Sequence, residues 1–408
     1  MDCSDKEPKP VDRNERIGEL DLIRGVALLG ILIANMPLYS SPYLYMNLLE
    51  TQWWTGLGDQ IAKNAINVLV EYKFITMFSL LFGAGFMIFL ERAEKAGRKG
   101  AGRYARRLAV LLAFGLVHGY FVWFGDILVI YAILGIALLA FRTCKANTLL
   151  VWAIGLLLVP SAWMALHTFV PGLVPWGLPP GPSTEEAERL VLDSIQAYGS
   201  GSYSDIFQQR LADSSNVQNG ALLTAPMTFA MFLLGAYAWR KDWLRNPRNH
   251  IDFFRKTLAW SGSIGVLFLV YQLWLYYGVD AERSGFNHAQ WSGILIAGPA
   301  ICLFYISSLI LLARKPFWRK LLAPFQDAGR MALTNYLMQS VVCTLLFYSY
   351  GLGWYGEVSP LYGLLLSLVI FAAQVWGSRL WLRRYRFGPA EWLWRSLTYG
   401  ERQPMKRG

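Results

Sequence analysis

The chain has 408 residues, of which 55% are hydrophobic, 15% aromatic and only 16% charged. Soluble proteins average about 25% charged residues, so this composition excludes an ordinary soluble protein. The net charge of +11 would suggest a nucleic-acid partner in a soluble chain, but here the bases lie between long uncharged runs, and we expect no nucleic acid. The four scattered cysteines form no CxxC pair, which argues against a disulfide framework and against a metal site.

The first uncharged run begins just after an acid and a base, Asp21 and Arg24. A helix rises about 1.5 Å per residue, so roughly 20 apolar residues cross a bilayer. We therefore expect a first membrane span over 20–38, with the polar residue Asn35 inside it. Asp21 and Arg24 are three residues apart, so they share one helix face at its entrance and can pair.

Similar uncharged runs recur along the whole sequence, so the predicted fold class is an all-α polytopic membrane protein with about ten transmembrane helices. An amphipathic helix is expected over 183–212, capped by Ser183 or Thr184, because glutamates follow in its first turn. We expect the spans at about 20–38, 74–90, 105–122, 126–141, 148–170, 214–239, 257–279, 284–313, 331–356 and 358–378.

A long polar segment divides the ten spans into two halves. The predicted organisation comprises a cytoplasmic tail, an N-terminal five-helix half, a periplasmic loop with an amphipathic helix, a C-terminal five-helix half and a short C-terminal tail. These parts cover residues 1–18, 19–170, 171–220, 221–400 and 401–408.

Basic residues predict the orientation of the spans. If the N-terminus lies inside, 33 of the 38 Lys and Arg residues fall in or next to inner segments, and the long outer loop holds six acids against two bases. This distribution obeys the positive-inside rule and places both termini in the cytoplasm. It also leaves a basic inner face that could attract anionic membrane lipids or a phosphorylated cofactor.

His118 and Asp126 are the ionisable groups of the third and fourth spans that stand out as candidates for chemistry. Charged groups in a bilayer are costly and usually functional. Histidine has the pKa range of a general base, and a carboxylate can fix its tautomer. The alternative is a structural histidine bonded to a carbonyl, with Gly115 and Gly119 forming a helix-packing face.

A second polar cluster opens the ninth span, where Arg330 precedes Asn335 and Gln339 by about one turn or more. The two amides are one turn apart and so share a helix face. They could line a cavity or form hydrogen bonds between helices; the pattern does not separate these possibilities.

The segments LDLIRGVALLGILIANM, FSLLFGAG, the HG…GDIL stretch, GRMALTNYLMQS and GPAEWLWR occur in this order. This series resembles the YeiB-type family of bacterial inner-membrane proteins, whose C-terminal half is a domain of unknown function. The D-x-x-R-G start is more distantly similar to heparan-α-glucosaminide N-acetyltransferase-like proteins. That resemblance implies transfer of an acyl group from cytoplasmic acyl-CoA or acetyl-CoA to a hydroxyl or amine at the outer face, with an essential histidine, here His118.

The expected function is therefore an acyl-CoA-dependent acyltransferase of the bacterial inner membrane that acts on an envelope glycan or lipid. Its catalytic residues would be His118 and Asp126. The CoA phosphates would be held near Asp21 by Arg24 and Arg330, and oxyanion donors would come from Asn35, Asn335 or Gln339. The alternatives are a transporter or flippase for a small or lipid-linked molecule and a non-catalytic membrane component; an oligomer is compatible with each.

Overall fold

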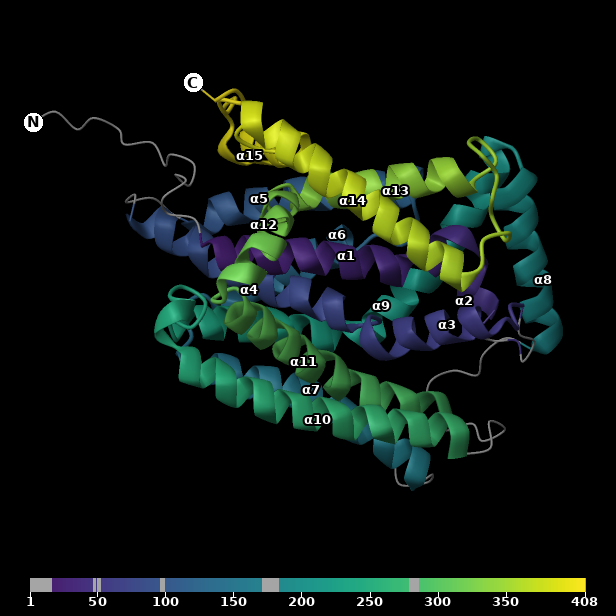
Figure 1. Cartoon of the computed structure of the whole chain (residues 1–408), viewed down its shortest axis with the longest axis horizontal. Coiled ribbons are helices and arrows are strands. Elements are labelled where there is room, and N and C mark those ends of the chain that lie inside the picture. The colour runs from purple at the N-terminus through teal and green to yellow at the C-terminus, as the bar shows by residue number, and fades with distance from the viewer. Residues whose placement is uncertain are drawn as a thin grey trace, which may run out of the picture.

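The computed structural model describes residues 17–46, 49, 53–95, 100–170, 183–278 and 286–407, and it is all-α in this part of the chain (Figure 1). The expected N-terminal tail and the first residues of the long loop lie outside these ranges. The α-helices are α1 (Gly18–Ser40), α2 (Tyr43–Met46), α3 (Leu57–Leu69), α4 (Lys73–Lys95), α5 (Gly100–Val117), α6 (Leu128–Leu138), α7 (Ala146–Phe169), α8 (Thr184–Ile195), α9 (Tyr203–Arg240), α10 (Ile251–Gly278), α11 (Phe286–Leu312), α12 (Pro316–Arg330), α13 (Ala332–Phe347), α14 (Pro360–Arg384) and α15 (Pro389–Tyr399). Four short π- or 3₁₀-helices complete the described chain: η2 (His118–Val122), η3 (Leu139–Phe141), η4 (Gln196–Ser200) and η5 (Pro247–Asn249).

The polytopic membrane architecture is confirmed. Within the described residues, eight helical segments are long and apolar enough to cross a membrane. The other two expected spans are shorter apolar helices, Leu128–Phe141 and Ala332–Phe347. All ten expected spans therefore contain a helix, but two of these helices are of reduced length.

The ninth span was predicted to reach residue 356, and this boundary is wrong. α13 ends at Phe347, because the next residues turn the chain back on itself. Gly353 and Gly356 adopt φ values of 71° and 84°, which residues with a Cβ rarely adopt. The backbone of Gly351 passes so close to Leu345 that a Cβ would meet its carbonyl oxygen at 1.9 Å.

The long loop also differs in detail from its prediction. Ser183 caps α8, since its hydroxyl accepts a hydrogen bond from the Glu186 N–H at 3.2 Å. The expected helix over 183–212 is nevertheless interrupted, because Ser202 and Asp205 form a capping box that starts a new helix. That new helix, α9, continues without a break through the sixth expected span.

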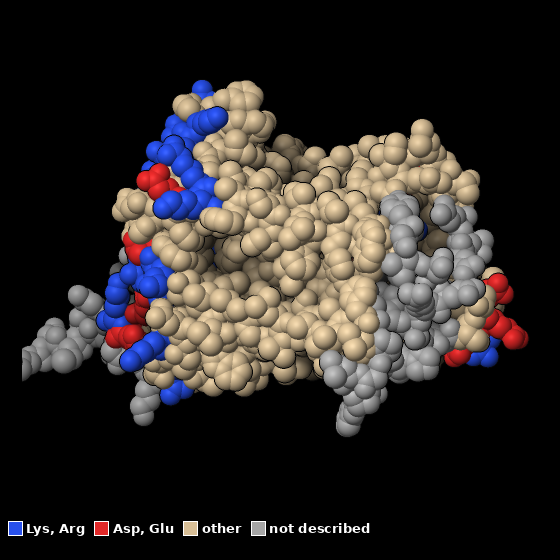
Figure 2. All heavy atoms as spheres, turned by 90° about the horizontal axis from the view of Figure 1, so that it is seen from below, with Lys and Arg blue, Asp and Glu red and all other residues tan. Residues whose placement is uncertain are grey.

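Charge is segregated along the bundle. In Figure 2, Lys and Arg gather at one end, which we call the basic end, and uncharged residues cover the middle of the molecule. Figure 1 places α15 at this end and α8 at the other. The positive-inside rule predicts that the basic end faces the cytoplasm.

Glycines allow the central helices to approach each other closely. A Cβ on Gly83 of α4 would lie 1.9 Å from the carbonyl oxygen of Phe232, and one on Gly235 of α9 would lie 1.9 Å from that of Leu80. Small residues at such contacts let backbones touch, which is a main source of helix association in membranes. α1 and α12 meet in the same way through Gly25 and Gly329.

We expect Gly235→Ala to destabilise the protein by about 1–3 kcal/mol, because the added methyl group forces α4 and α9 apart. The thermal unfolding midpoint of the detergent-purified protein should fall. Gly377→Ala in α14 is the matched control, since a Cβ there meets nothing within 4 Å. Equal midpoints for the two variants would contradict the close-packing assignment.

Candidate functional site

Four buried polar side chains form a continuous hydrogen-bonded chain inside the bundle. His118 Nδ1 lies 2.8 Å from Asp126 Oδ1, and His118 Nε2 lies 2.8 Å from Ser340 Oγ. Ser340 Oγ in turn lies 2.7 Å from the hydroxyl of Tyr39. We call Asp126, His118, Ser340 and Tyr39 the relay. The structure thus brings the predicted pair together and adds two hydroxyls from α13 and α1.

Local backbone geometry positions the first two members of the relay. α5 ends in the π-helix η2, which begins at His118; single π-turns of this kind are common at functional sites. Asp126 accepts a second hydrogen bond, from the Val129 N–H at 2.8 Å, at the start of α6. Gly115 makes this possible, because a Cβ there would lie 2.9 Å from the Asp126 carboxylate.

These contacts define the protonation pattern of the relay. An ionised carboxylate at Asp126 can only accept, so these distances fit the His118 tautomer that donates from Nδ1 and accepts the Ser340 hydrogen bond at Nε2. The His118 and Asp126 side chains are 1% and 5% exposed, so water does not compete for these bonds. An imidazole held in this way can remove a proton from a hydroxyl and pass it on.

Two aromatic residues flank His118. The rings of Tyr336 and Trp123 have centroids 5.2 and 6.4 Å from the imidazole. Tyr336 also bonds the turn before α6: its hydroxyl donates to the Gly125 carbonyl and accepts from the Ile127 N–H. The Trp123 Nε1–H is buried and has no hydrogen-bond partner among the described residues. It is therefore a free donor beside the relay.

A cavity of about 350 Å³ extends from the basic end toward the relay. Tyr336 and Ile127 belong to its wall, and Tyr336 lies one helical turn before Ser340 on α13. The cavity is apolar along its length and strongly basic at its mouth. Six arginines line it: Arg24, Arg92, Arg103, Arg107, Arg330 and Arg395.

The arginines at the mouth are crowded. Arg24 pairs with Asp21 at 3.0 Å, as predicted, and Arg330 pairs with Asp327 at 3.3 Å. Burial lowers the pKa of Arg395 to about 10, and the like charges of Arg107 and Arg92 act in the same direction. Arg395 therefore remains charged at neutral pH. The mutual repulsion of these arginines favours an anion at this mouth.

α15 closes one side of the cavity. Its Glu391 accepts hydrogen bonds from the N–H groups of Leu333 and Thr334 and from the Thr334 hydroxyl, and so caps the start of α13. Burial raises the pKa of Glu391 more than these hydrogen bonds lower it. Trp394 of the same helix stacks under Arg107, whose guanidinium carbon lies 3.5 Å from the ring centroid.

The predicted amide donors lie apart from this cavity. Asn335 donates to the Ala328 carbonyl and to Ser378 of α14, at 3.1 and 2.9 Å. Gln339 donates to Gln374, also of α14, at 3.0 Å. Of the two possibilities that the sequence left open, the contacts favour hydrogen bonds between helices. Asn35 is half-buried on α1, one turn before Tyr39.

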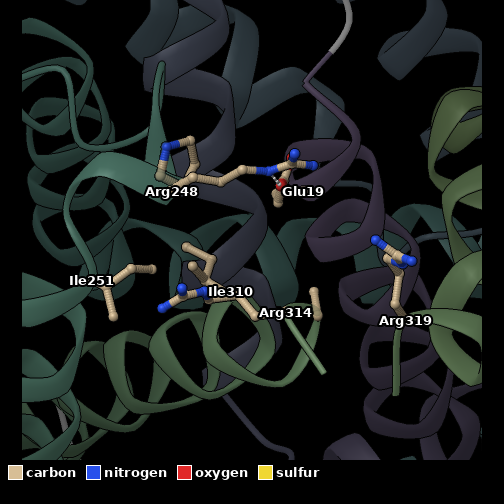
Figure 3. Close-up of a pocket in the computed structure, with 8 residues that line it drawn as sticks. Glu19, Arg248, Ile251, Ile310, Arg314 and Arg319 are labelled. Atoms are coloured by element: carbon tan, nitrogen blue, oxygen red, sulfur yellow. Dashed lines mark hydrogen bonds and ion pairs between the residues drawn. The ribbon is translucent and has the colours of Figure 1, made fainter. Parts of the chain in front are cut away.

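A second, smaller hollow of about 190 Å³ lies at the basic end and is lined by residues of α1, η5, α10, α11 and α12 and of the turn between α11 and α12. Figure 3 shows Arg248, Arg314 and Arg319 around it, with Arg248 donating to Glu19 at 3.0 Å. Its residues belong to neither the relay nor the larger cavity. Such basic hollows on the predicted inner face suit the head groups of anionic membrane lipids.

Sequence reasoning missed Ser340 and Tyr39. A serine in a membrane helix usually bonds its own backbone, so the sequence around Ser340 does not mark it as a site residue. The sequence around Tyr39 does not mark that residue either. The contact between His118 and Ser340 joins positions 222 residues apart. The one available clue was that Ser340 ends the motif GRMALTNYLMQS and follows Tyr336 by one turn.

Comparison with known proteins shows the family to which the chain belongs. Residues 238–401 match a family described as "Protein of unknown function (DUF418)". The chain is 39% identical to the Bacillus subtilis protein YxaH, with 98% of each chain covered. It is 31% identical to a 39.9 kDa protein of the amylase 3′ region of Bacillus acidopullulyticus, with 97% of each covered. It is 28% identical to YeiB of Escherichia coli, with 94% of this chain and 96% of that protein covered. These near-full-length matches show that the chain belongs to the YeiB-type family of DUF418 proteins.

Proposed function

We propose that this protein is an acyltransferase of the bacterial inner membrane that takes its acyl group from cytoplasmic acyl-CoA. The observation that carries the proposal is the relay, which lies one helical turn beyond Tyr336, a wall residue of the arginine-lined cavity. A histidine with a carboxylate on one nitrogen and a hydroxyl on the other is the arrangement that nucleophilic acyl transfer requires. The acceptor is a hydroxyl or amine of an envelope glycan or lipid.

The cavity mouth suits the donor. CoA carries several phosphates, and guanidinium groups bind phosphate oxygens with two parallel hydrogen bonds. Arg24 and Arg330 lie at this mouth and have only one acidic partner each in the described contacts. The apolar walls beyond them would accommodate the pantetheine arm and the acyl chain.

Ser340 is the group that we propose receives the acyl chain. Its oxygen attacks the thioester carbonyl carbon, the carbon–sulfur bond breaks, and His118 passes the serine proton to the CoA thiolate. The acceptor then attacks the acyl-serine ester, and its proton returns to Ser340 through His118. Asp126 keeps the imidazole in the required tautomer and stabilises its charged form. The unpartnered Trp123 N–H is the donor that we assign to the developing oxyanion.

We expect His118→Ala, Asp126→Asn and Ser340→Ala each to lower acyl transfer by about 10²–10⁴-fold, because each interrupts the proton path. Release of free CoA from acetyl-CoA by purified protein, with envelope extract as acceptor, measures the rate. His250→Ala is the control, since that histidine pairs with Asp242 away from the relay.

The same samples test the covalent step. Wild-type protein incubated with acetyl-CoA alone should carry an acetyl group on the peptide that contains Ser340, and the Ser340→Ala variant should not. Unchanged CoA release by His118→Ala would overturn the acyltransferase. Full activity of Ser340→Ala would instead show that the acceptor attacks the thioester directly.

Replacing Arg24 or Arg330 with Gln should raise the KM for acetyl-CoA about tenfold while kcat changes little, since a charged hydrogen bond to phosphate contributes about 1.5–3 kcal/mol. Arg319→Gln is the matched control, because Arg319 lies at the same end but lines the other hollow. An equal rise in KM for all three variants would mean that only the overall charge of the basic end matters.

Transport is a second candidate function, favoured by the break between α3 and α4. There Tyr72 adopts a φ of 62° and the buried Lys73 donates to the Asn67 carbonyl at 2.8 Å. Interrupted helices with a charged group are typical of transporter sites. Counterflow of a labelled envelope precursor in proteoliposomes, without covalent change, would support this function over acyl transfer.

A further inference from the structure

The half of the bundle away from the basic end contains a buried arginine with too few partners. Arg210 of α9 has a relative exposure of 0%. Its Nη1 donates to the Tyr120 carbonyl at 3.1 Å, but its Nε and Nη2 have no hydrogen-bond partner among the described residues. The Tyr203 ring lies 6.0 Å from its guanidinium carbon. A guanidinium cannot lose its proton in a protein, so this is a buried positive charge that is only partly compensated.

The nearest acid along the helix does not neutralise it. Asp213, one turn further, already accepts hydrogen bonds from the Tyr45 hydroxyl at 2.5 Å and from the Tyr198 hydroxyl at 2.7 Å. The amide of Gln209 donates to it as well, at 3.0 Å. Its carboxylate is therefore satisfied by neutral donors, and the described structure contains no ion pair between Asp213 and Arg210.

Other unused donors lie close to Arg210. The Tyr348 hydroxyl is buried and has no partner among the described residues. Its ring stacks on Tyr198 with centroids 4.4 Å apart, and Tyr198 bonds Asp213, one turn from Arg210 on α9. Ser214, one turn along α9, also has a buried hydroxyl without a described partner. A bound anion would satisfy the two unused nitrogens of Arg210 and these two neutral hydroxyls.

The position of this cluster relates it to the relay. Tyr120 lies two residues after His118 in η2, and Tyr348 lies eight residues after Ser340, just past the end of α13. Eight helical residues span roughly 12 Å, so the cluster lies beyond Ser340 on the side away from the arginine-lined cavity. In the proposed reaction the donor enters from that cavity, and the acceptor approaches from the side of Arg210.

We infer that Arg210, Tyr348 and Ser214 form a binding site for an anionic group, a phosphate or carboxylate, carried by the acceptor. The link to the acceptor rests on the proposed acyltransferase function, whereas the anion site itself does not. The inference narrows the acceptor to an envelope glycan or lipid with a negative charge near the hydroxyl or amine that becomes acylated.

Inorganic phosphate is the probe for the site, added to the full-length detergent-purified protein at constant ionic strength set with sodium chloride. We expect phosphate to raise the unfolding midpoint of the wild type, and Arg210→Gln to weaken this response about tenfold or more. Tyr348→Phe removes one neutral donor and should weaken it severalfold. Arg189→Gln, an exposed arginine of α8, should respond like the wild type.

Arg210→Lys is the second variant, for the case in which Arg210→Gln does not fold. Lysine keeps the positive charge but lacks the forked donors of arginine, so the phosphate response of this variant should still fall. A full response in Arg210→Lys and Tyr348→Phe, or an equal response of the wild type to chloride alone, would overturn the anion site.

A second measurement tests the link to the acceptor. Phosphate should inhibit CoA release competitively against envelope extract in the wild type, and this inhibition should weaken in Tyr348→Phe. Binding of phosphate without inhibition would show that the site holds a free anion and would overturn the acceptor assignment. Binding of phosphate by a protein that transfers no acyl group would overturn the acyltransferase and leave the anion site intact.

Discussion

The hydrogen-bonded relay is the constraint on which the rest of the structure depends. Four polar side chains lie in the middle of an apolar bundle, where each unsatisfied group would cost several kcal/mol. They are tolerated because Asp126, His118, Ser340 and Tyr39 satisfy one another, and this fixes η2, α13 and α1 at hydrogen-bond distance. The π-turn at the end of α5 and the glycine at position 115 are local features that make this contact possible.

The two sides of the relay differ in their charged residues. One side has a cavity whose mouth holds several arginines, and the other has the single buried Arg210. In the proposed reaction, an acyl carrier with phosphates and an acceptor with a negative charge would approach Ser340 from opposite sides. The acyl group would then cross the membrane while the acyl carrier and the acceptor each stay on their own side.

Much of this arrangement could be predicted from the sequence. A helix lies in each of the ten spans that hydropathy predicted, and the pairing of Asp21 with Arg24 followed from helical spacing. The sequence also predicted that Asn335 and Gln339 share a polar helix face. It did not predict their hydrogen-bond partners, because Ser378 and Gln374 belong to α14, a distant part of the chain. Ser340, Tyr39 and Arg210 could not be assigned, since their roles depend on long-range contacts or on the absence of contacts.

The short length of α13 has a consequence for the surrounding membrane. Its 16 residues span roughly 24 Å, less than the approximately 30 Å hydrocarbon core of a typical bilayer. Met338, Val341 and Leu345 of this helix are exposed and would face lipid. A bilayer adapts to a short apolar surface by thinning beside it. The leaflet next to α13 should therefore bring lipid head groups closer to Ser340 than they lie elsewhere around the protein. In the proposed reaction, this would shorten the path of a lipid-linked acceptor to Ser340.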